Sequence, residues 1–301
     1  MHPRPLLHSL RRWFDSSATP PEGADARPGR IDWFRVFPFV VMHLACLGAF
    51  WTGWSTGALA VAFVLYALRM LAITGFYHRY FSHRAFRTSR AAQFIFAVLG
   101  ASAAQRGPLW WASHHRQHHA HADGEGDAHS PRLHGFLWAH TGWFLSQDNF
   151  ATRQERVRDL SCYPELRFLD RFDILAPAML AALLFAVGGA QWLVWGFAIS
   201  TVALYHSTFT VNSLAHSFGS RRYATRDHSR NNPWLALITF GEGWHNNHHH
   251  FPGSARQGFF WWEIDLTYYF LRLLAVLGII WDLKPVPAAV RDARRITGAG
   301  A

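Results

Sequence analysis

Long apolar stretches, separated by loops rich in arginine and histidine, dominate the pattern of this sequence. A helix needs roughly 20 apolar residues to cross the hydrocarbon core of a bilayer. Four stretches approach that length: residues 36–54, 57–76, 173–187 and 192–215. A short uncharged turn around Ser55 joins the first two, and Gly188-Gly189-Ala190-Gln191 joins the last two. The pattern predicts an all-α integral membrane protein with four transmembrane helices in two hairpins.

Two further apolar stretches are predicted to lie along the membrane rather than to cross it. Residues 91–104 are short for a span, and a crossing there would put His78 and His115 on opposite sides of the membrane. Residues 259–281 are long enough but contain charged side chains, which the bilayer core penalises. We expect both to form re-entrant or interfacial helices packed against the bundle.

The placement of basic residues orients the predicted bundle. Of the 29, six precede the first predicted span, 12 lie between the second and third, and ten follow the fourth. Excess Lys and Arg mark cytoplasmic loops, so a helical cap carrying the histidine-rich loops, and both termini, are expected on the cytoplasmic side of a bacterial inner membrane. We expect a flexible or interfacial segment at 1–30, a membrane domain at 31–285 and a tail at 286–301.

Composition agrees with a membrane protein and argues against other classes. Half of the 301 residues are hydrophobic and 16% are charged, against roughly 25% charged in typical soluble domains. The net charge of +10 would suit nucleic-acid binding, but the basic residues alternate with apolar runs, so membrane lipid is the expected partner and nucleic acid is not. Cys46 and Cys162 cannot form a disulfide framework, and no signal peptide is visible.

The 20 histidines are the second anomaly, because many of them cluster. His245, His248 and His249 stand at i, i+3 and i+4, so one helical face would carry all three. Three more clusters lie near predicted span ends or in the loops: His115, His118 and His119; His78 and His83; and Asn212 with His216. On a regular helix, the step from His78 to His83 turns the two about 140° apart. The helix must therefore bend or end between them.

The predicted topology brings these clusters to one face of the bundle, where they suggest a metal centre. A single cluster could be a solvated loop, but nine imidazoles on one face share no packing role. Structural zinc needs only four ligands, so nine suit two ions of higher coordination. Imidazole binds iron, zinc, copper and nickel, so the spacing does not choose the metal.

The clusters resemble the histidine boxes of membrane-bound fatty acid desaturases. The matching motifs are His78-x4-His83, His115-x2-His118-His119, Asn212-x3-His216 and the run Gly241-Glu-Gly-Trp-His245-x2-His248-His249-x-Phe251-Pro252. The resemblance covers about residues 35–285 and is nearest to the Δ9, stearoyl-CoA desaturase-like group of acyl-CoA desaturases, in the form found in bacteria.

This resemblance implies an O2-dependent desaturase that introduces a cis double bond, at Δ9, into a saturated fatty acyl chain. It implies two non-haem iron ions held by the nine histidines, with Asn212 reaching the site through a water molecule. O2 and two electrons would be consumed. An unactivated methylene has no useful acidity, so a redox metal must carry the difficult step.

The resemblance also suggests residues that contact the substrate. A bent apolar tunnel is expected to include Gln105, Trp111, Thr208 and Phe209, the last at a position where relatives often carry Trp. Arg116 is a candidate for binding the substrate headgroup. Ordinary helix packing and a solvated charge, respectively, would explain the same residues without any such role.

The resemblance also implies the substrate and the electron donor, but the sequence departs from the family pattern at one position that bears on the substrate. Animal relatives carry Arg-Asp before the second histidine box, where it helps hold CoA, whereas this chain has Ser113-His114. The expected substrate is a fatty acyl thioester of CoA, with acyl-carrier protein and acyl-lipid as alternatives. No haem- or flavin-binding extension is apparent, so electrons are expected from a separate ferredoxin, rubredoxin-like or cytochrome b5-type protein with its reductase.

Two other functions stay open on the sequence alone. A hydroxylase or monooxygenase acting on fatty acyl chains or alkanes would use the same scaffold, because one oxidant can insert oxygen or remove a second hydrogen. A metal transporter with a histidine-rich loop would place ligands at mid-membrane, where only His43 and His206 lie.

Overall fold

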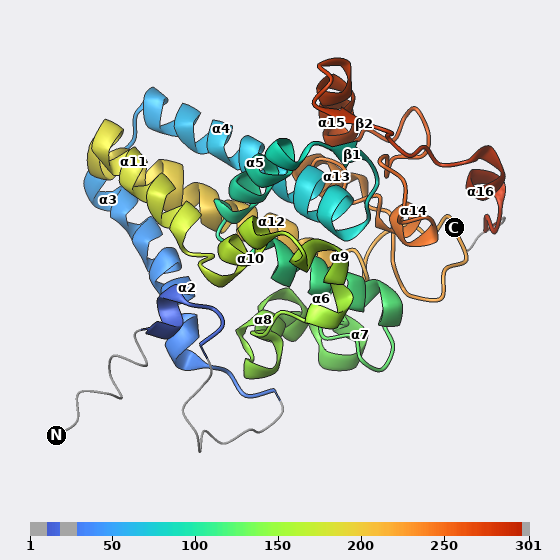
Figure 1. Ribbon diagram of the computed structural model, residues 1–301, viewed down its shortest axis with the longest axis horizontal. Helices are drawn as coiled ribbons and strands as arrows, with labels where there is room; N and C mark the ends of the chain where they lie inside the picture. The colour runs from blue at the N-terminus through green and yellow to red at the C-terminus, as the bar shows by residue number, and fades with distance from the viewer. Residues whose placement is uncertain (1–10, 19–28, 297–301) are drawn as a thin grey trace.

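The structure, a computed structural model, describes residues 11–18 and 29–296 and is mostly helical (Figure 1). Three helical runs are long and apolar enough to cross a membrane: Trp33–Thr52, Thr56–Ser82 and Leu175–Ser213. They comprise α2 (Trp33–Ala45), η1 (Cys46–Gly48) and α3 (Ala49–Thr52); α4 (Thr56–Leu71) and η2 (Ala72–Ser82); and α11 (Leu175–Trp192), η6 (Leu193–Ile199) and α12 (Ser200–Ser213).

The third run doubles back on itself at Gly189, whose backbone angles (φ 61°, ψ −157°) are not helical. A Cβ built on Gly196 would lie 3.4 Å from Leu184, although 12 residues along a straight helix are about 18 Å apart. Figure 1 shows α11 and the segment that follows it side by side, as their packing requires. The expected pair 173–187 and 192–215 is therefore an antiparallel hairpin.

The two hairpin turns share a backbone conformation and are held together. Gly53, at the end of α3, has φ 61° and ψ −161°, close to the angles of Gly189. From the second turn, the Gln191 amide donates to the Thr52 carbonyl (3.0 Å) and accepts from the Ser55 hydroxyl (2.7 Å). The turns of the two hairpins consequently lie side by side at the same end of the long helices.

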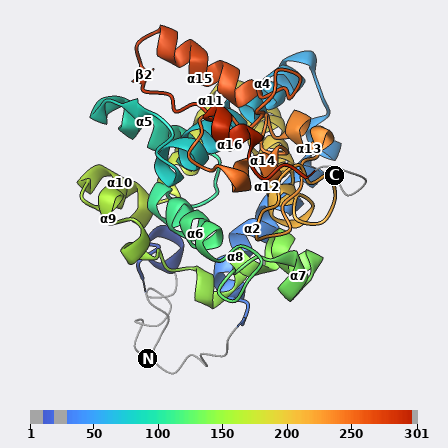
Figure 2. The same cartoon turned by 90° about the vertical axis from the view of Figure 1, so that its right-hand side faces the viewer.

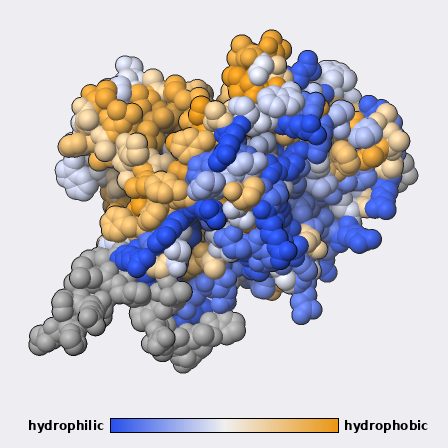
Figure 3. Space-filling model, viewed as in Figure 1, coloured by the Kyte–Doolittle hydropathy of each residue, from blue (hydrophilic) through white to orange (hydrophobic). Residues whose placement is uncertain are grey.

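The surface of these helices is apolar and exposed. Phe50, Trp51, Phe63 and Met179 each expose 70% or more of their surface. Figure 3 shows this hydrophobic region over the long helices, next to a mainly hydrophilic region, with a further hydrophobic patch over α15. An apolar surface of this extent on a soluble protein would drive aggregation, so it marks the part of the chain that meets lipid.

The two shorter apolar stretches form α5 (Arg90–Ala101) and α15 (Leu266–Val276). Two-residue strands link them, β1 (Arg87–Thr88) pairing antiparallel with β2 (Ile280–Trp281). Both helices are too short to span a bilayer. This was expected for residues 91–104, whereas residues 259–281 are long enough by sequence but are helical only over Leu266–Val276.

Shorter helices make up a cap at one end of the long helices, the end that faces the viewer in Figure 2. Before α11 these are α6 (Pro108–His121), α7 (Pro131–His134), η3 (Trp138–Gly142), α8 (Trp143–Leu145), η4 (Gln147–Asn149), η5 (Gln154–Arg156), α9 (Arg158–Ser161) and α10 (Pro164–Arg171). After α12 they are α13 (Pro233–Ile238), α14 (His245–His250) and α16 (Ala288–Asp292).

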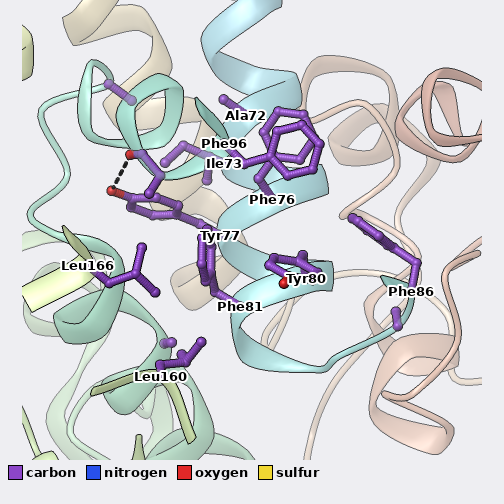
Figure 4. Packing of buried hydrophobic residues seen from close by; sticks show 14 of the residues in the cluster. Ala72, Ile73, Phe76, Tyr77, Tyr80, Phe81, Phe86, Phe96, Leu160 and Leu166 are labelled. Atoms are coloured by element: carbon purple, nitrogen blue, oxygen red, sulfur yellow. Dashed lines mark hydrogen bonds between the residues drawn. The ribbon is translucent and has the colours of Figure 1, made fainter. Parts of the chain in front are cut away.

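The core lies where η2 packs against α5 (Figure 4). The rings of Phe76 and Phe96 stack with centroids 3.7 Å apart, and the Tyr77 hydroxyl donates to the Ala97 carbonyl (3.4 Å). Because η2 is buried over its whole length, the residues it carries are held rigidly.

Part of the expected N-terminal segment is also ordered against the domain. Trp13 stacks on Phe34 and donates to its carbonyl (2.7 Å), and Arg12 pairs with Asp32. Residues 1–10 and 19–28, where the rest of that segment falls, lie outside the described residues. At the other end, Ile296 donates to the Arg222 carbonyl (2.8 Å), so most of the expected tail also packs on the domain.

Candidate metal centre

The structure brings the nine predicted histidines together in two groups. The first histidine group consists of His78, His83, His115, His119 and His248. The second histidine group consists of His118, His216, His245 and His249. Within each group, one ring nitrogen of every member lies within 4.8 Å of the others. Residues up to 170 positions apart in sequence, His78 and His248, therefore meet in one group.

The π-helical geometry of η2 explains how His78 and His83 share a face. In a π-helix the amide of residue i+5 bonds to the carbonyl of residue i, and the His83 amide donates to the His78 carbonyl at 3.3 Å. One wide turn thus separates the two residues, and their ring centroids are 4.9 Å apart. The sequence predicted that the helix bends or ends between the two residues; the structure shows a π-helical run that ends at Ser82, directly before His83.

Helices α6 and α14 each contribute to both groups. On α6, His115 and His119 enter the first group and His118 enters the second. On α14 the assignment is reversed: His245 and His249 enter the second group and His248 the first. The i, i+4 pair of each helix serves one group, and the intervening residue at i+3 serves the other. His216 follows α12 and completes the second group.

Carboxylates hold the rings of the second histidine group. Three of its members bond through Nδ1 to an aspartate: His118 to Asp127 (3.1 Å), His216 to Asp123 (2.8 Å) and His249 to Asp227 (2.9 Å). A carboxylate accepts, so Nδ1 carries the proton and Nε2 presents a bare lone pair. In the first group, His78 Nδ1 pairs in the same way with Glu242.

The electrostatics keep most of these imidazoles neutral and the carboxylates charged. Burial lowers the pKa of five of the histidines well below the usual range: His83, His115, His119, His245 and His248. Burial alone would raise the pKa of Asp123 and Asp227, but their hydrogen bonds from His216 and His249 hold it far below the usual value. Neutral imidazole is the form that binds a metal.

The arrangement of donor atoms fits a cation in each group. His216 Nε2 lies 3.0 Å from His245 Nε2, and His78 Nε2 lies 3.0 Å from His248 Nε2. Since Nδ1 of His78 and His216 donates to a carboxylate, their Nε2 lone pairs face neighbouring ring nitrogens and are available to a cation. An all-imidazole set suits iron, copper, nickel or zinc.

A cavity of about 120 Å³ runs past both groups. His78 and His115 of the first group and His118 and His245 of the second line it. The four residues expected along a tunnel also line it, together with Asn212: these are Gln105, Trp111, Thr208 and Phe209. The Gln105 amide donates to the Thr208 hydroxyl (2.9 Å), which ties the loop before α6 to α12.

Arg116, the expected headgroup residue, is engaged elsewhere. Its five N–H groups are directed to the carbonyls of Phe81, Ser82 and Arg156 and to both carboxylate oxygens of Asp159. It therefore fixes the chain beside His83 and has no donor left for a substrate in this conformation.

Sequence reasoning missed the carboxylates. Glu242 lies inside the motif Gly241–Pro252 that points to the desaturases, yet the motif alone does not say which ring it holds. No sequence motif marks Asp123 or Asp227 as a partner of a histidine. Asp123 lies 93 positions from His216 in the sequence, and Asp227 lies 22 positions from His249.

The histidines inside the predicted spans form a separate row. His43 Nε2 lies 3.1 Å from His206 Nε2, and His206 Nδ1 lies 3.0 Å from His140 Nε2. His206 uses both ring nitrogens in this row, so the three rings do not converge on a common point as the two histidine groups do. This gives no support to a metal path through the membrane.

Comparison with known proteins gives the family. The model of the family described as "Fatty acid desaturase" matches residues 52–277, which include all nine histidines. This chain belongs to the fatty acid desaturase family. It is 41% identical over 259 residues to the palmitoyl-monogalactosyldiacylglycerol delta-7 desaturase of Arabidopsis thaliana, covering 84% of this chain and 69% of that protein.

Relatives with other substrates are equally similar. The chain is 41% identical to the icosanoyl-CoA 5-desaturase of Limnanthes douglasii, over 81% of this chain and 70% of that protein. It is 38% identical to the sn-1 stearoyl-lipid 9-desaturase of Anabaena variabilis, over 85% of this chain and 94% of that protein. The fatty acid desaturase family makes this chain a metal-binding oxidoreductase of lipid metabolism at a membrane.

Proposed function

We propose that this desaturase uses O2 and two electrons to introduce a cis double bond at Δ9 into a saturated fatty acyl chain, with two iron ions at the histidine groups. The observation that carries the proposal is the cavity, because one apolar passage is lined by members of both groups. The similarity to the stearoyl-lipid 9-desaturase over 94% of its length supports the Δ9 position.

The nine histidines would hold the iron, with Asn212 adding a contact through a water molecule. Bound iron supplies the one-electron chemistry that an unactivated C–H bond requires. In the overall reaction, two hydrogens leave adjacent methylenes, and O2, with two electrons and two protons, becomes two waters. The electrons come from a separate donor protein.

The protein's own residues position the imidazoles and the acyl chain, and they exclude water. The carboxylates orient the imidazoles, and the hydrogen-bonded pair of Gln105 and Thr208 sits on the cavity wall where we place the bend of the acyl chain. His78 and His248 of the first histidine group are buried, and this shelter from bulk water would limit side reactions at the reacting carbons. Residues Trp111 and Phe209 complete the apolar wall of this tunnel.

We further propose that the two hairpins cross the inner membrane four times, with the cap in the cytoplasm. The fold-back at Gly189, the adjacent turns and the exposed apolar surface support four crossings. The basic loops support the orientation.

The function is tested by expressing the chain in a bacterial host that cannot make unsaturated fatty acids. We expect growth to be restored and cis-Δ9 monounsaturated acids to appear in the fatty acid methyl esters. His248→Ala should abolish the product. His250→Ala is the matched control, because His250 bonds the Val290 carbonyl and belongs to neither group. Hydroxy acids without alkene, or an active His248→Ala variant, would overturn the proposal.

A further inference from the structure

One arginine lies inside a membrane-spanning run, away from both histidine groups. Arg69 stands in the last turn of α4 and is only 2% exposed. Among the described residues it forms hydrogen bonds to carbonyl and hydroxyl oxygens but no ion pair with a carboxylate. A charged side chain within a span is costly, and such residues commonly serve a function. The contacts of Arg69 indicate what that function is.

The guanidinium of Arg69 joins three segments of the chain. Its Nε donates to the Leu65 carbonyl of the same helix at 3.1 Å. Nη1 donates to the Thr201 hydroxyl (2.6 Å) and to the Ser102 carbonyl (3.4 Å), and Nη2 donates to the Ser200 hydroxyl. The planar, rigid fork of the guanidinium therefore fixes α12 and the end of α5 relative to α4.

The end of α5 leads into residues 102–106, which we call the clamped loop. Two of its residues have left-handed backbone angles although neither is glycine: Ala104 with φ 56° and Arg106 with φ 70°. Such conformations are strained and persist only where the surroundings hold them. Tyr205 on α12 supplies a second contact of this kind, because its hydroxyl donates to the Ala104 carbonyl at 2.7 Å. Arg69 and Tyr205 thus hold two successive carbonyls of the clamped loop that flank one residue.

The clamped loop places Gln105 on the cavity wall. Gln105 donates to Thr208 there, and both residues line the cavity together with Tyr205. Thr201, which accepts from Arg69, lies one helical turn before Tyr205 and two turns before Thr208. Arg69 is not among the described residues that line the cavity. Its influence on a bound chain must therefore pass through the clamped loop and α12.

We infer that Arg69 and Tyr205 are positioning residues, which fix the bend of the acyl chain relative to the two histidine groups and so decide which pair of methylenes reacts. The inference rests on the proposed function. A displacement of about 1 Å can change a rate by roughly 100-fold, and neighbouring methylenes are offset by a similar distance. Loosening the clamped loop therefore allows more than one register of the chain to react.

The first test measures the position of the double bond. Tyr205→Phe removes the hydroxyl but keeps the ring, which stacks on Phe39 and Phe209. Arg69→Lys keeps the charge but loses the fork. Mass spectrometry of dimethyl disulfide adducts of the fatty acid methyl esters locates the double bond. We expect the ratio of Δ9 to adjacent positional isomers to fall roughly three- to tenfold in each variant, the range of one hydrogen bond.

Tyr66→Phe is the matched control. It also removes a tyrosine hydroxyl that donates to a backbone carbonyl, that of Ile238 at 2.6 Å, but Tyr66 is not among the described residues that line the cavity. This variant should keep the isomer ratio of the wild type. An equal fall in the control would overturn the inference, because any lost hydrogen bond in the membrane region would then have the same effect.

The second test measures hydrogen–deuterium exchange over residues 102–106 in metal-free protein in detergent. Exchange should be roughly three- to tenfold faster in Tyr205→Phe and in Arg69→Lys than in the wild type or Tyr66→Phe. Unchanged exchange would show that the two residues do not hold the clamped loop. Faster exchange with an unchanged isomer ratio would reduce them to a structural role, and either result overturns the inference. Exchange requires neither iron nor turnover, and a hydroxy product, whose position can be read in the same way, would overturn the proposed function alone.

Discussion

At the scale of single residues, the two histidine groups differ in the charge that surrounds them. Three aspartates support the second group, whereas Glu242 supports the first and is itself paired with Arg79 at 3.1 Å. A carboxylate that accepts from Nδ1 raises the basicity of the imidazole and fixes its ring. The second group therefore compensates for its smaller number of imidazoles with more negative charge.

Asp227→Asn should weaken metal binding by the second histidine group. An amide can still accept from His249 Nδ1 at 2.9 Å, but it brings no charge. Loss of such a partner typically costs 10- to 100-fold in metal affinity, so we expect about that loss. Competition with a chelator, followed by metal analysis, measures it. Asp292→Asn, which alters an exposed carboxylate beside Arg291, is the control; equal retention of metal by both variants would contradict the role.

The buried carboxyl of Asp170 should make the stability of the folded protein depend on pH. Burial first, and then the nearby Asp173, raise the pKa of its carboxyl from 3.8 to about 6. Between these values the folded state holds a proton that the unfolded chain releases, so this contribution to stability falls as pH rises through the window. At about 1.4 kcal/mol per pKa unit, the loss is on the order of 3 kcal/mol.

Asp170→Asn removes that ionisation and keeps an acceptor for the Trp110 amide, which now donates at 2.7 Å. The melting temperature of the variant minus that of the wild type should therefore increase from pH 4 to pH 7 in detergent. A difference that is constant or shrinks over this range would show that Asp170 does not titrate as described.

At the scale of elements, regular helical spacing predicted much of the site and failed where the helix is not regular. The i, i+3, i+4 pattern correctly indicated shared faces on α6 and α14. It could not show that His118 and His248 serve the opposite group from their neighbours, because that depends on how the two helices face each other. The π-helical step between His78 and His83 likewise departs from the regular spacing that the sequence pattern assumes.

The contact between α5 and η2 gives a prediction at this scale. A Cβ on Gly100 of α5 would lie 2.0 Å from the ring of Tyr77, which immediately precedes His78. Gly100→Ala should push this ring aside, cost about 1–3 kcal/mol through overpacking and lower the metal content of the first histidine group. Thermal melting and metal analysis measure the two effects. Gly57→Ala is the control, since its nearest neighbour would be the Ser55 hydroxyl oxygen at 3.9 Å; a similar outcome for both variants would rule out the steric explanation.

At the scale of the whole molecule, sequence patterns indicated a helical membrane protein with a histidine-rich centre. Apolar runs and turn residues carry that information locally, as Ser55 and Gly189 illustrate. The carboxylate partners and the engagement of Arg116 with Asp159 were not predictable, because these contacts join segments that only the folded cap brings together.

Four crossings predict a labelling pattern for the intact membrane. Ala190 is exposed at the turn of the second hairpin, and Cys162 is exposed in the cap. In a Cys46→Ser background, a membrane-impermeant maleimide applied to intact spheroplasts should label an Ala190→Cys variant there and leave Cys162 unlabelled. Permeabilised membranes should expose both. If residues 175–213 crossed only once, position 190 would lie near the bilayer centre and stay unlabelled in either sample, because thiolate formation requires water. Labelling of Cys162 in intact spheroplasts would instead place the cap, and with it the metal centre, on the outer side.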